Sequence, residues 1–379
     1  MDQRIELFSM DFTSLRLCIL SGLLRMFLRN EIQAVRFNRI DVLFIFWMAI
    51  GAIIYVLQWA DMSSIIYKMG VLFDGFGFYW LFRQMIRKWE DISSVVSVFA
   101  ILAIVSAPLI LLERILKSSP YAFMGYSQAS MHRGRFRCSG PFPHYIMMGL
   151  FWTSLLPWFY SFIRMKIKKY FYWTAIGSGL FCMVMSNSST PLLTLFFMSG
   201  FWFLYPYRRY GRQIFFIIAA ILMGLHLLME SSVWHLMARV DIFSGSTGWH
   251  RYFLFDQFIR HTSEWFFLGT RSTAHWGMGL EDVTNQYVLE AVRGGFLTLC
   301  IFLWLNVLCV TVSGQASMTF SVGKKSWLSW GICISVLGHI ISFWGVSYFG
   351  QIIMIFYLTI VLVAFLQEQI SHDRRPMLP

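Results

Sequence analysis

Apolar stretches long enough to cross a membrane recur along this chain of 379 residues, and they limit what it can fold into. A helix rises about 1.5 Å per residue, so roughly 20 apolar residues span the hydrocarbon core of a bilayer. Helices satisfy their backbone hydrogen bonds internally, as lipid requires, whereas a transmembrane barrel would show short alternating segments. The sequence therefore predicts an all-α, polytopic membrane protein.

The composition agrees with a membrane location. Hydrophobic residues make up 57% of the chain and charged residues only 13%, whereas soluble domains are roughly 25% charged. The net charge is +12, but the positions of the basic residues matter more than their sum, because membrane topology sorts them. No cleavable signal peptide is evident, since Arg16 and Arg25 interrupt the apolar residues 15–28. We expect that segment to form an interfacial helix on the inner leaflet.

Hydropathy predicts about ten spanning helices. The expected spans are residues 42–60, 66–82, 95–112, 143–163, 171–188, 191–206, 213–230, 286–312, 327–344 and 348–366. They form a single transmembrane domain, 42–366, between a cytoplasmic N-terminal segment, 1–41, and a cytoplasmic tail, 367–379. Two long loops, 113–142 and 231–285, would lie on the outer side of the membrane.

Basic residues indicate the orientation of these spans. With the N-terminus in the cytoplasm, each short inner loop carries at least two of them: Arg83, Arg87 and Lys88; Arg164, Lys166, Lys168 and Lys169; Arg208, Arg209 and Arg212; Lys324 and Lys325. Short cytoplasmic loops are enriched in Lys and Arg. An even number of spans returns the chain to the side where it began, so we expect both termini in the cytoplasm.

The outer side nevertheless holds basic residues, against this sorting rule. They are Arg114, Lys117, Arg133, Arg135 and Arg137 in the first loop, Arg239, Arg251, Arg260 and Arg271 in the second, and Arg293 inside the eighth span. A guanidinium is a planar fork that matches the oxygens of phosphate or carboxylate. This pattern is suited to an anionic lipid-linked substrate such as a polyprenyl pyrophosphate. Solvated loop charges, or contacts with lipid head groups, are the alternative.

The second outer loop predicts an amphipathic helix after a glycine-rich turn. Arg251, Leu254, Phe255 and Phe258 fall at helical spacing on one face. We expect this helix to lie in the membrane interface with Arg251 on its membrane-facing side. Further along the loop, Asp282 is either a carboxylate of the site or the N-terminal cap of the eighth span.

Motifs in three regions, in a fixed order, resemble the O-antigen ligase/polymerase superfamily. They are Arg137-x-x-Gly-Pro-Phe-x-His144 before a span, the polar turn from Ser186 to Pro191, and Gly248-x-x-Arg251 followed by Leu268-Gly269, Asp282-x-x-Asn285-x-Tyr287 and Gly294-Gly295. The resemblance covers about residues 120–300. It implies a metal-independent, inverting glycosyltransferase of the bacterial inner membrane. That enzyme would move glycan from undecaprenyl pyrophosphate to a growing polysaccharide or to a lipid A core.

The resemblance also implies roles for individual residues. Catalytic roles would fall to Arg137, Arg251, Asp282 and His144, and substrate binding to Arg133, Arg135, His250, Arg271, His275, Asn285 and Arg293. The two catalytic arginines would hold the pyrophosphate and stabilise its leaving charge. The base for the acceptor hydroxyl would be Asp282 or one of His144, His250 and His275. Family ligases commonly carry His directly before the Asn, where this chain has Thr284, and this difference favours a polymerase over a ligase.

A transporter or flippase is the rival class of function. It predicts interrupted spans in two related halves with a site at the membrane midplane. This chain shows no internal symmetry, and its charges gather in the outer loops. We expect no nucleic-acid partner.

We expect no cofactor and no metal. The outer acidic residues form no Asp-x-Asp pattern, and the neighbours Glu281 and Asp282 would point about 100° apart on a helix. Inside the spans, Glu290 and Arg293 are spaced to pair with one another, and Asp74 is a further ionisable candidate.

Overall fold

The computed structural model describes residues 5–7, 10–122, 130–132, 135–229, 233–235, 248–320 and 323–373. The helices are α1 (Ser14–Leu28), α2 (Arg39–Trp59), α3 (Met62–Met85), α4 (Trp89–Leu116), α5 (Tyr145–Arg164), α6 (Lys169–Met185), α7 (Ser189–Phe203), α8 (Gly211–Leu228), α10 (Gly248–Arg260), α11 (Thr262–Trp265), α12 (Gln286–Thr319), α13 (Lys324–Ser342) and α14 (Gln351–Asp373). Short 3₁₀ helices cover Tyr205–Tyr210, Val233–His235 and Ala274–Trp276. The strands are β1 (Ile5–Leu7) paired with β2 (Met10–Phe12), and β3 (Ser130–His132) paired with β4 (Arg135–Arg137), both antiparallel.

Seven helices of the described part are long and apolar enough to cross a membrane: α2, α3, α4, α5, the segment Tyr205–Leu228 that contains α8, α12 and α14. This finding agrees with an all-α, multi-pass membrane protein. Three of the expected spans correspond to helices outside this group. Helices α6 and α7 have only 17 and 15 residues, and α13 has 19 residues but is less apolar than the seven.

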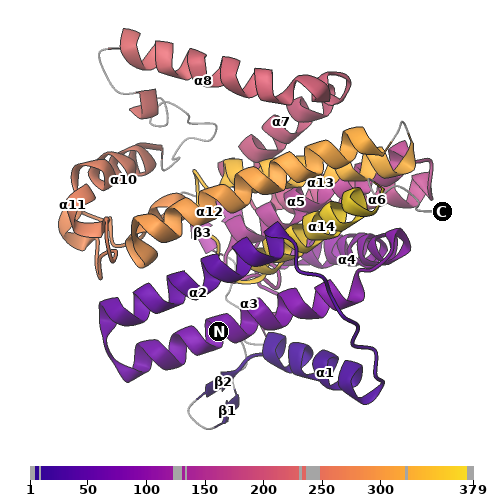
Figure 1. Ribbon diagram of the computed structural model, residues 1–379, viewed down its shortest axis with the longest axis horizontal. Helices are drawn as coiled ribbons and strands as arrows, with labels where there is room; N and C mark the ends of the chain where they lie inside the picture. Colours follow the sequence, from indigo (N-terminus) through magenta and orange to yellow (C-terminus); the bar gives the residue numbers. More distant parts are fainter. Residues whose placement is uncertain are drawn as a thin grey trace.

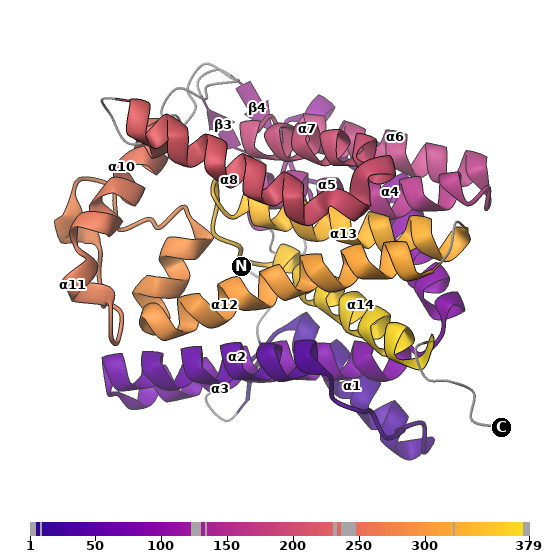
Figure 2. The same ribbon diagram turned by 45° about the horizontal axis from the view of Figure 1, so that its top comes forward.

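The helices form a bundle around α5 and α14. Helix α5 packs against α6, α7, α13 and α14, while α12 packs against α2, α13 and α14. Figures 1 and 2 show α2 and α3 along one edge of the bundle and α8 along the opposite edge. No residue in the apolar stretch of α8 is buried, whereas 83% of the stretch in α5 is. A bilayer would solvate the apolar surface of α8.

Buried ion pairs join the helices near one end of α2, α3 and α14. Arg83 Nε lies 2.9 Å from Asp41 Oδ1, and the Tyr79 hydroxyl donates to the same carboxylate at 2.7 Å. Arg83 Nη1 also reaches Glu368 of α14 at 3.2 Å. Because these groups are mutually satisfied, they stabilise the fold and are not free to bind a substrate.

Helix α1, expected on the inner leaflet, packs against α3 in the structure. Arg16 Nε lies 2.8 Å from Asp74 Oδ1. The charge of Asp74, which interrupts the second span, is therefore matched by a cation from α1. This ion pair gives Asp74 a structural role, the attachment of α1 to α3.

Close packing at a kink in α12 explains two glycines of the sequence motif, Gly269 and Gly295. Gly295 has φ +67°, and a Cβ there would lie 2.3 Å from the Phe267 carbonyl oxygen. Gly269 has φ +74°, and its Cβ would lie 2.1 Å from the Val292 carbonyl oxygen. Glycine at both positions lets the loop after α11 dock closely against α12, where the Phe296 N–H donates to the carbonyl of residue 266 at 2.8 Å.

Candidate functional site

Arg137 ends strand β4, and the last turn of α4 holds this strand in place. Arg114 Nη1 donates to the Phe136 carbonyl oxygen at 2.7 Å. Glu113 is fully buried and accepts the N–H of Gly140 at 2.9 Å. Residues 136–140 are thereby fixed to α4, and the backbone of Arg137 is fixed with them.

The Arg137 guanidinium lies over an aromatic ring, and one of its N–H groups has no hydrogen-bond partner among the described residues. Its Cζ lies 4.5 Å from the centroid of the Tyr145 ring, and its Nη1 donates to the Tyr145 hydroxyl. Its Nε is buried and has no hydrogen-bond partner among the described residues. A buried donor without an acceptor costs roughly 1–3 kcal/mol, so Arg137 is suited to an anion that supplies the missing oxygen.

Arg251 on α10 has the same kind of open donor. Its Nη2 donates to Thr190 Oγ1 at 3.0 Å, in the first turn of α7, while its Nε is buried and unpartnered among the described residues. Burial lowers the pKa of the Arg251 guanidinium, yet arginine keeps its charge at any working pH. Both arginines therefore present a partly buried guanidinium whose Nε has no hydrogen-bond partner among the described residues.

The expectation that Arg251 faces the membrane is wrong. Leu254 and Phe258, which share its helical face, are buried in a cluster with Trp265, Trp276 and other side chains of the loop and α12. The apolar face of α10 therefore packs on protein. Arg251 points with that face toward α7, and a Cβ at Gly345 would lie 3.6 Å from its Cζ.

The segments that carry the two arginines both contact one turn, the turn between α6 and α7. Asn187 Nδ2 donates to the carbonyl of Phe136, the residue before Arg137, at 3.4 Å. Three residues later, Thr190 accepts from Arg251. The polar turn noted in the sequence thus links strand β4 to helix α10.

His144 lies near Arg137 and caps α5. Its Nδ1 accepts the N–H of Ile146 at 3.2 Å, which leaves the proton of the neutral ring on Nε2. Burial and the charge of Arg137 lower the pKa of His144, while the carboxylate of Asp282 raises it. A neutral His144 is therefore a hydrogen-bond donor through Nε2, and this geometry suits a phosphate oxygen better than the abstraction of a proton.

The start of α12 shows that Asp282 is not the cap of this helix. The cap is Asn285, whose Oδ1 accepts the N–H of Tyr287 at 2.9 Å and whose Nδ2 donates to the Trp344 carbonyl at 3.3 Å. Asn285 is fully buried with its amide occupied at both ends, so it stabilises the helix start and is not open to a substrate. Asp282 is exposed, and its own carbonyl oxygen lies 3.4 Å from His250 Nε2.

Two other expected residues lie apart from this site. Arg271 Nε donates to the Gln58 carbonyl at 2.8 Å, at the C-terminal end of α2. His275 Nε2 lies 2.7 Å from Glu264 Oε2. Arg271 therefore links the segment after α11 to α2, and His275 links that segment to α11.

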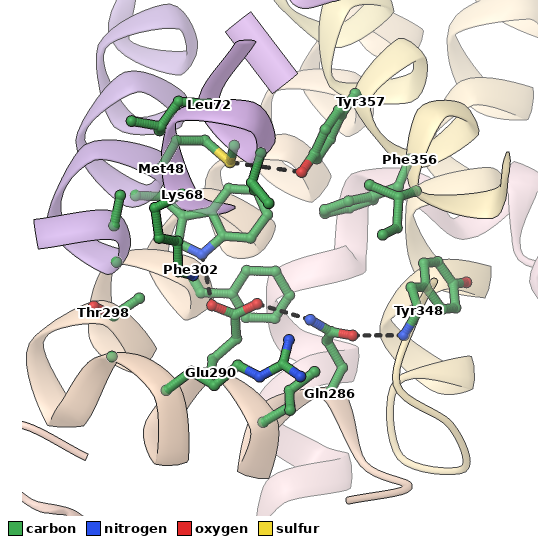
Figure 3. Close-up of a pocket in the computed structure, with 18 of the residues that line it drawn as sticks. Met48, Lys68, Leu72, Gln286, Glu290, Thr298, Phe302, Tyr348, Phe356 and Tyr357 are labelled. Atoms are coloured by element: carbon green, nitrogen blue, oxygen red, sulfur yellow. Dashed lines mark hydrogen bonds between the residues drawn. The ribbon is translucent and has the colours of Figure 1, made fainter. Parts of the chain in front are cut away.

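The expected pair of Glu290 and Arg293 is not formed. Glu290 accepts from Trp47 Nε1 at 2.8 Å and from Gln286 Nε2 at 2.7 Å. Arg293 instead lines a cavity between helices, which is drawn in Figure 3.

Arg133 and the side chain of Arg135 lie outside the described residues. Three contributors to the site were not expected from the sequence: Thr190, Tyr145 and Glu113. Tyr145 directly follows the His144 motif and Thr190 lies in the polar turn, so their positions beside these motifs could have indicated them. No local sequence signal could have indicated Glu113, because its role depends on backbone N–H groups more than 20 residues away.

Among the described residues, no group of three or more His, Cys, Asp or Glu side chains could hold a metal ion. Comparisons of the chain with protein-family models, with curated proteins and with solved structures found no match. The chemistry of the candidate site depends on four groups. They are two guanidinium groups whose buried Nε has no partner among the described residues, a neutral imidazole and an exposed carboxylate, located near the starts of α5, α7 and α12 in a multi-pass α-helical membrane protein.

Proposed function

We propose that this protein is an inverting membrane glycosyltransferase, a polysaccharide polymerase that moves glycan from undecaprenyl pyrophosphate to a growing chain. The observation that carries the proposal is that Arg137 and Arg251 each have a buried Nε without a partner among the described residues, on segments that both contact the turn between α6 and α7. A pyrophosphate supplies both the acceptor oxygens and the negative charge that these groups lack. The resemblance of the surrounding motifs to the O-antigen ligase/polymerase superfamily supports the same conclusion.

In the proposed reaction, an acceptor hydroxyl attacks the anomeric carbon of the donor sugar while the bond from that carbon to the pyrophosphate breaks. Negative charge grows on the leaving pyrophosphate, where Arg137 and Arg251 stabilise it. His144 donates from Nε2 to a phosphate oxygen. The exposed carboxylate of Asp282 accepts the proton of the acceptor hydroxyl. Attack from the face opposite the leaving group inverts the anomeric centre.

We further propose ten spans in a bacterial inner membrane, with both termini in the cytoplasm and the arginine pair at the outer surface. Helices α6, α7 and α13 all pack against α5, which is itself long and apolar enough to span. A helix of 17 residues such as α6 covers about 26 Å at 1.5 Å per residue, close to the thickness of the hydrocarbon core. The basic loops support this orientation.

The test uses purified protein in liposomes with an oligosaccharide linked to undecaprenyl pyrophosphate, in excess EDTA. We expect release of undecaprenyl pyrophosphate together with longer lipid-linked glycans, at a rate that EDTA does not reduce. Transfer that requires an added lipid A core would identify a ligase instead. Passage of the intact donor across the bilayer without release of undecaprenyl pyrophosphate would identify a flippase and contradict the proposal.

A further inference from the structure

A cavity of about 190 Å³ that contains charged side chains lies among α2, α3, α12 and α14 (Figure 3). Helix α2 contributes Trp47 to its wall, α3 contributes Lys68, and α12 contributes Gln286, Glu290 and Arg293. The catalytic arginines are not among the lining residues. This cavity is therefore separate from the proposed pyrophosphate site.

The carboxylate in this cavity is held by neutral donors. Glu290 Oε2 accepts from Trp47 Nε1 at 2.8 Å, and its Oε1 accepts from Gln286 Nε2 at 2.7 Å. Gln286 is fixed in turn, because its Oε1 accepts the Tyr348 N–H at 2.7 Å, and Figure 3 shows these contacts in one row. Both oxygens of Glu290 are thus occupied without a contact to a cation.

The two cations of the cavity have no carboxylate in contact. Among the described residues, neither Lys68 nor Arg293 forms an ion pair. Lys68 Nζ instead lies 4.2 Å from the centroid of the Tyr55 ring. Two positive groups and one carboxylate leave the cavity with a net charge of +1 between spanning helices, where an uncompensated charge is expensive. One singly charged anion would balance it.

The surface around the cavity indicates where that anion comes from. Exposed apolar side chains flank it, with Tyr67 49% exposed on α3 and Phe296 and Leu297 44% and 53% exposed on α12. Such a surface faces lipid in a membrane protein, so an occupant arrives from the bilayer more readily than from water. We propose that this cavity binds the singly charged phosphate of a membrane lipid head group, with Lys68 and Arg293 as its ligands. This inference does not depend on glycosyl transfer.

The test measures the affinity of delipidated protein in detergent for phosphatidylglycerol by native mass spectrometry. Lys68→Gln and Arg293→Gln should each weaken binding roughly tenfold or more, since each removes a charge-assisted hydrogen bond. Glu290→Gln should tighten binding, because it raises the charge of the cavity. Arg260→Gln, which removes an exposed outer charge elsewhere, should leave binding unchanged. Diacylglycerol with the same acyl chains should bind weakly to all variants.

Equal affinity for phosphatidylglycerol in the wild type, Lys68→Gln and Arg293→Gln would overturn the proposal. Competition by inorganic phosphate as effective as that by the lipid would assign the cavity to a free anion and also overturn it. The opposite effect expected for Glu290→Gln guards against loss of binding through misfolding, because a damaged protein would not bind lipid more tightly.

Discussion

Replacing Arg251 with lysine keeps the positive charge and removes the planar fork. In the structure one arm of that fork binds Thr190 at 3.0 Å while Nε–H remains open, and a single ammonium cannot reproduce both directions. One charge-assisted hydrogen bond to the leaving pyrophosphate is worth about 1.5–3 kcal/mol. At about 1.4 kcal/mol per factor of ten, Arg251→Lys should lower the rate roughly 10- to 100-fold. Arg251→Ala also removes the charge and should cost about 10²–10³-fold.

The assay is the release of undecaprenyl pyrophosphate by purified protein at saturating acceptor. Arg260 provides a matched control on the same helix, since its side chain is 69% exposed and pairs with Asp256 at 2.7 Å. Arg260→Lys and Arg260→Ala should keep the wild-type rate. Full activity in Arg251→Lys, or an equal loss in the Arg260 variants, would show that Arg251 acts only through its charge. Either result would refute a specific role for its planar guanidinium.

Three further predictions concern the site, the fold and the topology. His144 should titrate below the usual histidine pKa of 6.5 in ¹⁵N NMR spectra of histidine-labelled protein. Asp282→Asn should lower the pKa of His144 further, because the Asp282 carboxylate raises it. A pKa at or above 6.5 would contradict the burial of the His144 ring. Arg83→Ala should destabilise the protein by about 3–5 kcal/mol in denaturant unfolding, because it leaves a buried carboxylate unpaired; a loss below about 1 kcal/mol, typical of exposed pairs, would show that water reaches this network. In a cysteine-less background, Met278→Cys, at a side chain 97% exposed in the second loop, should react with an impermeant maleimide in intact spheroplasts. Lys166→Cys should react only after lysis, and the reverse pattern would invert the topology.

The sequence predicted most helices and the polar turn between α6 and α7, because hydropathy and polar turn residues are local signals. Their ends were less predictable. Helix α12 continues to Thr319, beyond the expected end at 312. Ser313 and Ser317 return hydrogen bonds to the backbone carbonyls of Cys309 and Gly314, each at 2.6 Å. Serines that satisfy themselves in this way can extend a helix although they lower its hydropathy.

The direction of Arg251 could not be predicted for a different reason. Helical spacing shows which face of α10 is apolar, but not whether lipid or protein covers it. The covering residues include Trp276 and Val288, which follow well beyond α10 along the chain. Likewise, Asp282 and Asn285 are both residues that commonly cap helices. Only the position of the first helical turn decides between them.

That Arg137 and Arg251 hold one pyrophosphate is tested most directly by a double-mutant cycle of affinity for undecaprenyl pyrophosphate. Arg137→Ala and Arg251→Ala should each weaken binding about tenfold or more, in the presence of EDTA as in its absence. Because both side chains would contact the same ligand, the loss in the double variant should differ from the sum of the single losses by at least about 0.5 kcal/mol. Unchanged affinity in the single variants, or strictly additive losses, would contradict a shared site.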